Sequence, residues 1–179
     1  MAAFTVIDHT EIGASGAASW EVTGIPSSYD HLYLEVSTRS DQTAGWTVYL
    51  SDVRLQVSSD TGSNYSSTNI YWYNATTPLS DRGGATYLDR MKCAATGTLA
   101  DTFTPMTMWI PNYANTTGFK QIVGQQSVEN NSTTDYRYYM GLNAFLWQST
   151  AAVTALKLYP STSDFVQYST FTLYGVSGA

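Results

Sequence analysis

Hydrophobic and polar residues alternate along several stretches of the chain, with the period of two that is typical of a half-buried β-strand. In the segment 31–38, Leu32, Leu34 and Val36 fall on one face, and mostly polar residues occupy the other. About eleven short strands are expected in all, and no window shows a helical period. The other expected strands lie around residues 20–23, 46–50, 53–57, 68–74, 86–93, 103–110, 119–128, 135–145, 153–159 and 166–176.

The alternation changes phase within one part of this pattern. Val48 and Leu50 share one face, whereas Val53 and Leu55 occupy positions of the opposite parity. An inserted residue in a strand produces such a slip. We therefore expect a bulge or a short turn near residues 51–52.

The segments between the expected strands are rich in residues that favour turns. Residues 60–64 (DTGSN) form a turn by composition. Short strands separated by such connections are typical of antiparallel sandwiches. We predict an all-β fold, a single antiparallel β-sandwich domain over residues 1–179, of the jelly-roll type. The other connections carry Gly, Pro, Asn and Ser and lie at residues 78–84, 111–118, 129–134 and 160–164.

Composition and charge agree with this fold and argue against two classes of partner. The chain has fourteen tyrosines, and only 12% of its residues are charged. At 179 residues it is long enough to bury roughly 70% of its unfolded surface without a disulfide or a metal. Its net charge of −6, with eight basic residues spread along the chain, argues against a nucleic-acid partner. The apolar runs are too short for a membrane helix, so no membrane partner is expected.

Few residues could support catalysis or bind a metal. The two histidines, His9 and His31, do not form the His-x-His pair of a metal-binding jelly roll. Asp30 and His31 stand near Ser27, but no nucleophile elbow accompanies them. Cys93 is expected to be a small buried residue rather than a nucleophile. The protein is therefore not expected to be an enzyme, and no catalytic, cofactor-binding or metal-binding residue and no cofactor is predicted.

The turn at residues 60–64 has a second interpretation. Its side-chain oxygens could hold Ca²⁺, but no bidentate glutamate follows at a useful spacing. Turns rich in Asp and Asn are far commoner than calcium loops, so the turn is favoured.

Two segments, 70–73 and 136–140, are apolar or aromatic on both faces. One interpretation is that one face fills a thick core and tyrosine hydroxyls cap it in water. Another is that the outer face meets a protein partner, because interface cores favour Tyr, Trp, Met and Arg. A third is a sugar-stacking platform built from Trp46, Trp72 or Tyr73. The candidate interface residues are Tyr71, Trp72, Tyr73, Tyr136, Tyr138 and Tyr139.

Five blocks of the sequence stand out: residues 25–34 (IPSSYDHLYL), 37–41 (STRSD), 60–66 (DTGSNYS), 110–114 (IPNYA) and 171–176 (FTLYGV). Together they resemble a group of small structural proteins of tailed bacteriophages. The resemblance extends from about Ile7 to the C-terminus. It departs from the group's pattern at residues 52–57, where the strand after Trp46 would be expected to run straight into the turn.

The resemblance implies a β-sandwich or jelly-roll component of the virion. The implied role is capsid decoration, in which copies sit on the outer capsid surface and cement neighbouring subunits of the major capsid protein. It implies a homo-oligomer, a trimer at local threefold positions, made in the cytoplasm of the bacterial host. The alternative within the group is a tail, neck or fibre subunit that binds a receptor or glycan. The family supplies no catalytic residues.

Overall fold

The structure is a computed structural model, and it describes residues 3–43, 49–73, 77–131 and 138–178. These residues form twelve strands in two antiparallel sheets and no helix. The predicted all-β antiparallel sandwich is therefore confirmed. Chain connections cross repeatedly between the sheets, as from β1 to β2, from β2 to β3 and from β3 to β4.

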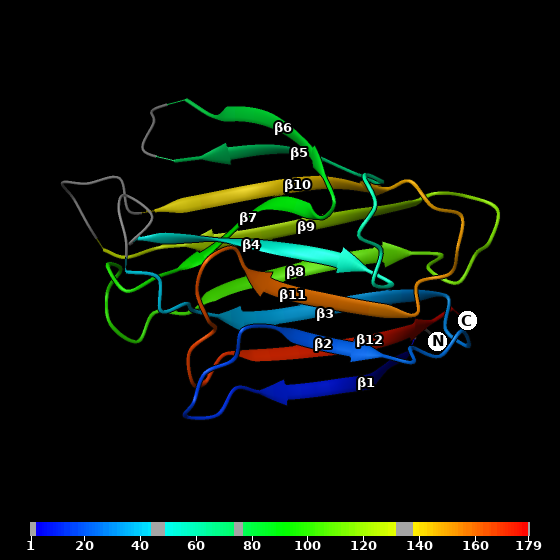
Figure 1. Ribbon diagram of the computed structural model, residues 1–179, viewed down its shortest axis with the longest axis horizontal. Helices are drawn as coiled ribbons and strands as arrows, with labels where there is room; N and C mark the ends of the chain where they lie inside the picture. Colours follow the sequence, from blue (N-terminus) through cyan, green and yellow to red (C-terminus); the bar gives the residue numbers. More distant parts are fainter. Residues whose placement is uncertain (1–2, 44–48, 74–76, 132–137, 179) are drawn as a thin grey trace.

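The larger sheet has eight strands and the smaller sheet has four. The smaller sheet lies in front of the larger one in Figure 1, with the β5–β6 hairpin at the top of the view and β1 at the bottom. The order in the larger sheet is β1 (Ala3–Glu11), β12 (Thr170–Ser177), β3 (His31–Thr38), β8 (Thr104–Pro111), β9 (Lys120–Val128), β10 (Tyr139–Trp147), β5 (Tyr65–Trp72) and β6 (Leu79–Ala85). The order in the smaller sheet is β2 (Trp20–Thr23), β11 (Ala155–Pro160), β4 (Leu50–Val57) and β7 (Leu88–Ala94).

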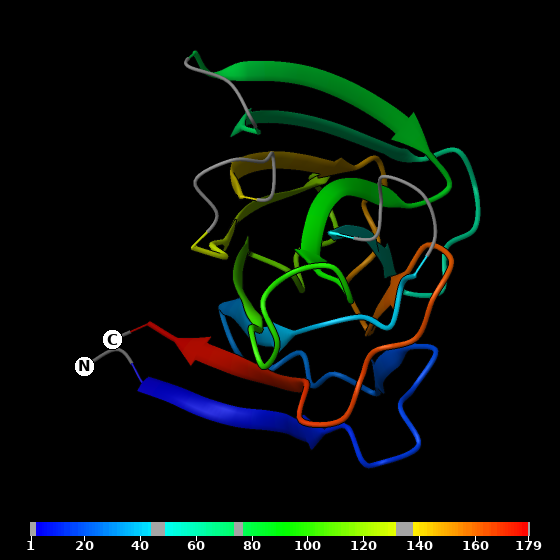
Figure 2. The same ribbon diagram turned by 90° about the vertical axis from the view of Figure 1, so that its left-hand side faces the viewer.

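The main core lies between the two sheets. Leu32 and Leu34 of β3 are completely buried, as their alternation predicts, and they belong to one cluster with Leu55 and Leu158 of the smaller sheet. A second, smaller cluster contains Leu50 of β4 together with residues at the ends of β7, β9 and β10. The β5–β6 hairpin extends the larger sheet beyond the smaller one, as the turned view in Figure 2 shows. One end of the sandwich is therefore partly open beneath this hairpin.

The prediction of a bulge or a short turn near residues 51–52 is wrong. Strand β4 pairs with β7 without interruption from Leu50 to Val53, and the register shift follows between Val53 and Leu55. The extra residue belongs to the partner strand, because two residues of β7, Asp89 and Arg90, lie opposite one position of β4. The change of phase in the sequence has another cause. Leu50 packs in the smaller cluster, whereas Val53 and Leu55 pack in the main core.

Two strands fall where the sequence predicts none. Strand β1 is an edge strand with mostly exposed side chains, so it lacks the clean alternation of a core strand. Strand β6 occupies residues assigned from sequence to a turn, and Gly83 and Gly84 lie within it. As the outermost strand of the larger sheet, β6 tolerates glycines that would weaken a central strand. The residues Trp46 and Val48 lie outside the described part of the chain.

Candidate functional site

The candidate interface residues lie on two different surfaces, because successive side chains of a strand point to opposite faces. Tyr136 lies outside the described residues. Tyr139 is only 3% exposed and stacks on Tyr71, with ring centroids 5.5 Å apart. Tyr71 and Tyr73 both pack against the cluster that contains Tyr139. Trp72 and Tyr138 instead line a shared hollow on the other side of the larger sheet.

The outer face of the larger sheet, turned away from the smaller sheet, carries a continuous row of apolar and aromatic side chains. Direct cross-strand pairing joins its members from β1 to β10. Val123, near the middle, is 53% exposed. Antiparallel sheets that face water on one side normally present polar residues there, so this row needs an explanation. The row consists of Val6, Tyr174, Tyr33, Trp109, Val123 and Ala144.

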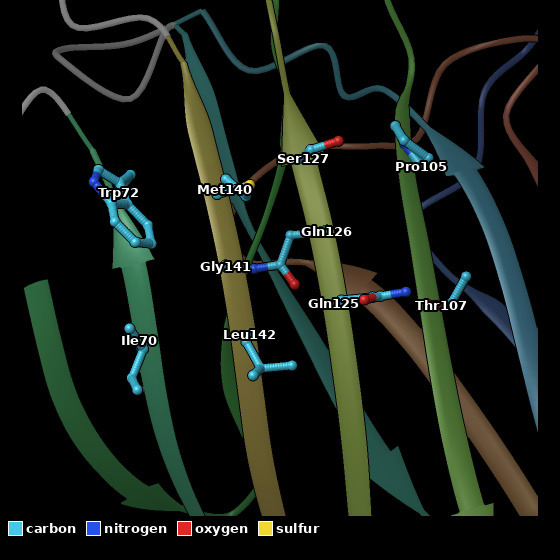
Figure 3. A pocket seen from close by; sticks show the side chains of 10 residues that line it. All are labelled: Ile70, Trp72, Pro105, Thr107, Gln125, Gln126, Ser127, Met140, Gly141 and Leu142. Atoms are coloured by element: carbon cyan, nitrogen blue, oxygen red, sulfur yellow. The ribbon is translucent and has the colours of Figure 1, made fainter. Parts of the chain in front are cut away.

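A shallow groove lies beside this row, at the end of the face formed by β5, β10, β9 and β8. It has a volume of about 490 Å³, and its lining side chains are shown in Figure 3. Ile70, Trp72, Met140 and Leu142 make one side apolar, and Met140 and Leu142 are more than half exposed. The hollow that contains Tyr138 continues the groove past Met140. We call the row and the groove together the outer apolar face.

A second site lies beneath the β5–β6 hairpin, between the two sheets. It is a cleft of about 270 Å³ at the partly open end of the sandwich. Strands β5, β6, β7, β4 and β10 all contribute to its wall. Its lining residues are Leu50, Asn69, Tyr71, Tyr73, Asp81, Arg90, Lys92 and Tyr139. We call it the hairpin cleft.

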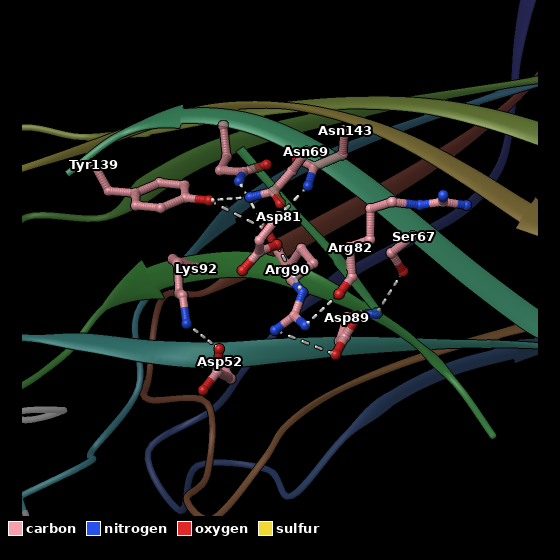
Figure 4. A network of polar contacts seen from close by, with 11 residues as sticks. Asp52, Ser67, Asn69, Asp81, Arg82, Asp89, Arg90, Lys92, Tyr139 and Asn143 are labelled. Atoms are coloured by element: carbon pink, nitrogen blue, oxygen red, sulfur yellow. Dashed lines mark hydrogen bonds and ion pairs between the residues drawn. The ribbon is translucent and has the colours of Figure 1, made fainter. Parts of the chain in front are cut away.

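The bulge in β7 determines the chemistry of the hairpin cleft. Arg90 adopts a left-handed backbone conformation with φ 78°, which costs a non-glycine residue about 1–3 kcal/mol. Its carbonyl accepts hydrogen bonds from Asn143 Nδ2 at 3.0 Å, from Gln126 Nε2 at 3.4 Å and from the Tyr139 hydroxyl at 3.4 Å. Side chains from β9 and β10 thus hold the bulge against the larger sheet, as Figure 4 shows.

The Arg90 side chain connects the bulge to the hairpin. Its Nε lies 3.0 Å from the Asp81 carboxylate of β6, and its guanidinium donates to the Arg82 carbonyl at 3.0 Å. The same guanidinium lies 3.7 Å from the Asp89 carboxylate. Lys92 forms an ion pair with Asp52 of β4. Acidic and basic groups are therefore paired along one wall of the cleft.

Asn69 and Tyr139 form the polar floor of the cleft. The Asn69 amide lies 3.1 Å from the Tyr139 hydroxyl, and with its oxygen toward that hydroxyl its nitrogen reaches the Asp81 carbonyl at 3.2 Å. Burial raises the pKa of Tyr139 to about 12, and burial also raises the pKa of Tyr73. Both tyrosines are therefore neutral at physiological pH and can donate as well as accept hydrogen bonds.

The other residues considered from the sequence have structural roles. Residues 60–64 lie in the connection between β4 and β5 and bend at residues 62–63, and the Asp60 carboxylate accepts a hydrogen bond from Trp147 Nε1 at 2.7 Å. Cys93 is completely buried, as predicted, and burial raises the pKa of its thiol to about 12. His31 Nδ1 accepts a hydrogen bond from the Asn112 amide at 3.1 Å. Among the described residues, no group of three His, Cys, Asp or Glu side chains could hold a metal ion.

No family model, curated protein or solved structure matches the chain. Within the described ranges, no helix has the length and apolar character needed to cross a membrane. Sequence reasoning missed Val123 and Leu142 of the outer apolar face and Asp81 and Arg90 of the hairpin cleft. The apolar positions of β9 and β10 give a signal for the first pair, because they occur at both parities of each strand. The sequence carries no comparable signal for the second pair, which the hairpin brings together.

Proposed function

We propose that the protein is a structural component of a tailed-bacteriophage virion, which binds the outer capsid surface through its outer apolar face. The observation that carries this proposal is the row of cross-strand apolar side chains, in which Val6 and Val123 are more than half exposed. Exposed apolar patches larger than a few hundred Å² mark sites of association on soluble proteins. The sequence resemblance supplies the class of partner, the major capsid protein, and the expected role of cement between its subunits.

The size of the outer face suits a stable interface. Eight strands of about eight residues, spaced about 4.8 Å apart and rising about 3.3 Å per residue, present a face of about 900 Å². Stable protein interfaces bury about 800 Å² on each partner. One copy could therefore use most of the sheet as its contact with the shell.

The side chains of the row also suit contact with a protein. Tyr33, Tyr174 and Trp109 provide large rigid rings, which interface cores favour. Phe4 packs edge-on against Tyr33 and Tyr174, with ring centroids 5.7 and 5.9 Å away, and this cluster is pre-organised before any partner binds. Since the row itself contains no charged residue, few charges need to be desolvated on binding.

We also infer that the sandwich is a jelly roll with two inserted hairpins, which agrees with the resemblance. Eight strands form two four-stranded sets, β1-β12-β3-β8 and β2-β11-β4-β7. Taken in chain order, these eight strands pass from one set to the other at every step except between β4 and β7. This is the winding of two Greek keys in a double sheet. The additions, β5–β6 and β9–β10, enlarge only the sheet that carries the outer apolar face.

A cement role explains how a surface of moderate affinity becomes useful. Each copy contributes its binding free energy only when the shell is assembled, and the contribution repeats over the particle. In the trimer that the resemblance implies, strand edges would be covered by neighbouring copies, which would suppress uncontrolled strand pairing.

The proposal is tested by the double variant Met140→Thr with Leu142→Thr. Both side chains are exposed, so the fold and the melting temperature should change little. Binding to shells assembled from the major capsid protein, measured by co-sedimentation, should weaken by about tenfold or more, equivalent to about 1.4 kcal/mol. The control is Leu99→Thr, which changes an exposed leucine outside the strands. Unchanged binding by the double variant, or no binding by the wild-type protein, would contradict the proposal.

A further inference from the structure

The hairpin cleft has features of a ligand site that shell binding does not use. It lies between the sheets, whereas the outer apolar face lies on the opposite side of the larger sheet. A strained residue, Arg90, projects into it from a β-bulge. Bulges often re-aim side chains beside functional sites, and strain that a fold retains points to a role for the strained residue.

Charge excludes an anionic ligand from the cleft. Three carboxylates, those of Asp52, Asp81 and Asp89, surround the two cations Arg90 and Lys92. Each cation is already paired, and the group as a whole is negative. A phosphate or carboxylate would therefore have to displace an existing ion pair and approach other acids. A cationic ligand meets the same obstacle, because the carboxylates are already paired with Arg90 and Lys92. The ligand that fits is therefore neutral.

Hydrogen-bonding groups of both kinds line the cleft. Arg90 and Lys92 are donors and Asp81 is an acceptor, whereas the buried Asn69 amide is already bonded to Tyr139 and Asp81. Hydroxyl groups both donate and accept, so a polyhydroxylated molecule can bond to such a mixed wall.

Aromatic rings provide the apolar part of the cleft. Tyr71 is held by its stacked contact with Tyr139, at an interplanar angle of 19°. Tyr73 lies two residues further along the chain and lines the same cleft. A sugar ring presents C–H groups on its faces and hydroxyls on its rim, which matches flat aromatic rings beside polar groups.

We propose that the hairpin cleft binds a neutral carbohydrate, with one sugar ring against Tyr71 and Tyr73 and its hydroxyls bonded to Asp81, Arg90 and Lys92. The volume of about 270 Å³ lies just below the range of about 300–1,000 Å³ for small-molecule pockets. The cleft is therefore suited to a single ring or to the end of a chain. This site is independent of the virion role, because a capsid protein and a tail protein could each carry it.

The test titrates the full-length protein with methyl glycosides of glucose, galactose, mannose and N-acetylglucosamine, one at a time, and follows side-chain and backbone NMR signals. At least one glycoside should shift the Asn69 amide and Arg90 Nε signals saturably, in the millimolar range. The variants Tyr73→Ala and Asp81→Asn should each weaken that binding by about tenfold or more. The control, Tyr168→Ala, removes an exposed tyrosine outside the cleft and should bind as the wild type does.

Three results would overturn the proposal. One is that none of the glycosides shifts the signals of the cleft. Another is that both cleft variants, shown to be folded by their NMR spectra, retain wild-type affinity. The last is that inorganic phosphate shifts the cleft signals and the glycosides do not, which would make the cleft an anion site. None of these results bears on whether the outer apolar face binds a capsid shell.

Discussion

Single buried donors and acceptors determine several features of this protein at the residue scale. The Asp60 carboxylate accepts hydrogen bonds from Trp147 Nε1, from Asn64 Nδ2 at 2.9 Å and from the Gly62 amide at 2.8 Å. Trp147 is 2% exposed, so its indole N–H has no access to bulk water. The turn that resembles a calcium loop in sequence thus uses its oxygens to satisfy a donor of β10 and donors within the turn itself.

Asp60→Ala should destabilise the fold by about 1–3 kcal/mol, because it leaves a buried indole donor without its partner. The hydrogen bonds from Trp147 and Asn64 lower the pKa of Asp60 from its ordinary value of 3.8. Its contribution is therefore fully present above that value and is lost as the pH falls through the lowered pKa. Urea unfolding at pH 7 and at low pH measures both effects, with the exposed Glu11→Ala as control. Equal stability of Asp60→Ala and wild type at pH 7 would contradict this role.

Buried tyrosines predict a loss of stability at high pH. Burial raises the pKa of both Tyr65 and Tyr139 from the ordinary 10.0 to about 12. Between these values the unfolded chain releases protons that the folded chain retains, so the free energy of unfolding falls as the pH rises from about 10 to about 12. Unfolding curves across this range should show the fall, and Tyr139→Phe should reduce its slope. A slope unchanged by Tyr139→Phe would show that Tyr139 does not titrate as described.

At the scale of elements, the sequence predicts well those strands that alternate against one core. Leu32, Leu34 and Val36 of β3 are buried as their spacing indicates. Strands β1 and β6 were missed because each is an edge strand, with mostly exposed or half-buried side chains. Alternation of apolar and polar residues reflects burial of one face of a strand. An edge strand with little buried surface therefore shows little alternation.

The candidate site shows a different limit of the sequence. The parity of Tyr71, Trp72 and Tyr73 predicts that Trp72 faces away from its two neighbours, and this is observed. The sequence does not say which face is covered, because the hairpin and β7 come together only in the folded sheet. Asp81 and Arg90 meet across that contact. Their pairing depends on the bulge in β7, whereas the alternation in the β4 sequence predicts an irregularity at residues 51–52.

Arg90→Ala should loosen the β5–β6 hairpin without unfolding the sandwich. The variant removes the ion pair with Asp81 and the hydrogen bond to the Arg82 carbonyl, and partly exposed pairs of this kind contribute about 0.2–1 kcal/mol. Hydrogen exchange of β6 amides should therefore accelerate by a few fold, while β3 amides keep their protection. Unchanged exchange in β6, or equal acceleration in both strands, would contradict a local role for Arg90.

At the scale of the whole molecule, the two sheets are unequal. The smaller sheet covers only part of the inner face of the larger one, and the hairpin cleft lies where this cover ends. The larger sheet packs against the main core on its inner face and carries an apolar row on its outer face as well. The described N- and C-terminal strands, β1 and β12, pair along one edge, and their outer ends lie together (Figure 1). Because of this row, the outer apolar face is the surface through which we propose that the molecule binds its partner.

A cryo-electron microscopy map of the virion whose genome encodes this chain tests the central claim most directly. The account predicts density for the sandwich repeated over the icosahedral shell, with Val123, Met140 and Leu142 against the major capsid protein. Density confined to the tail or its fibres would contradict the capsid role. Density on the shell with the outer apolar face turned to solvent would contradict the proposed contact surface.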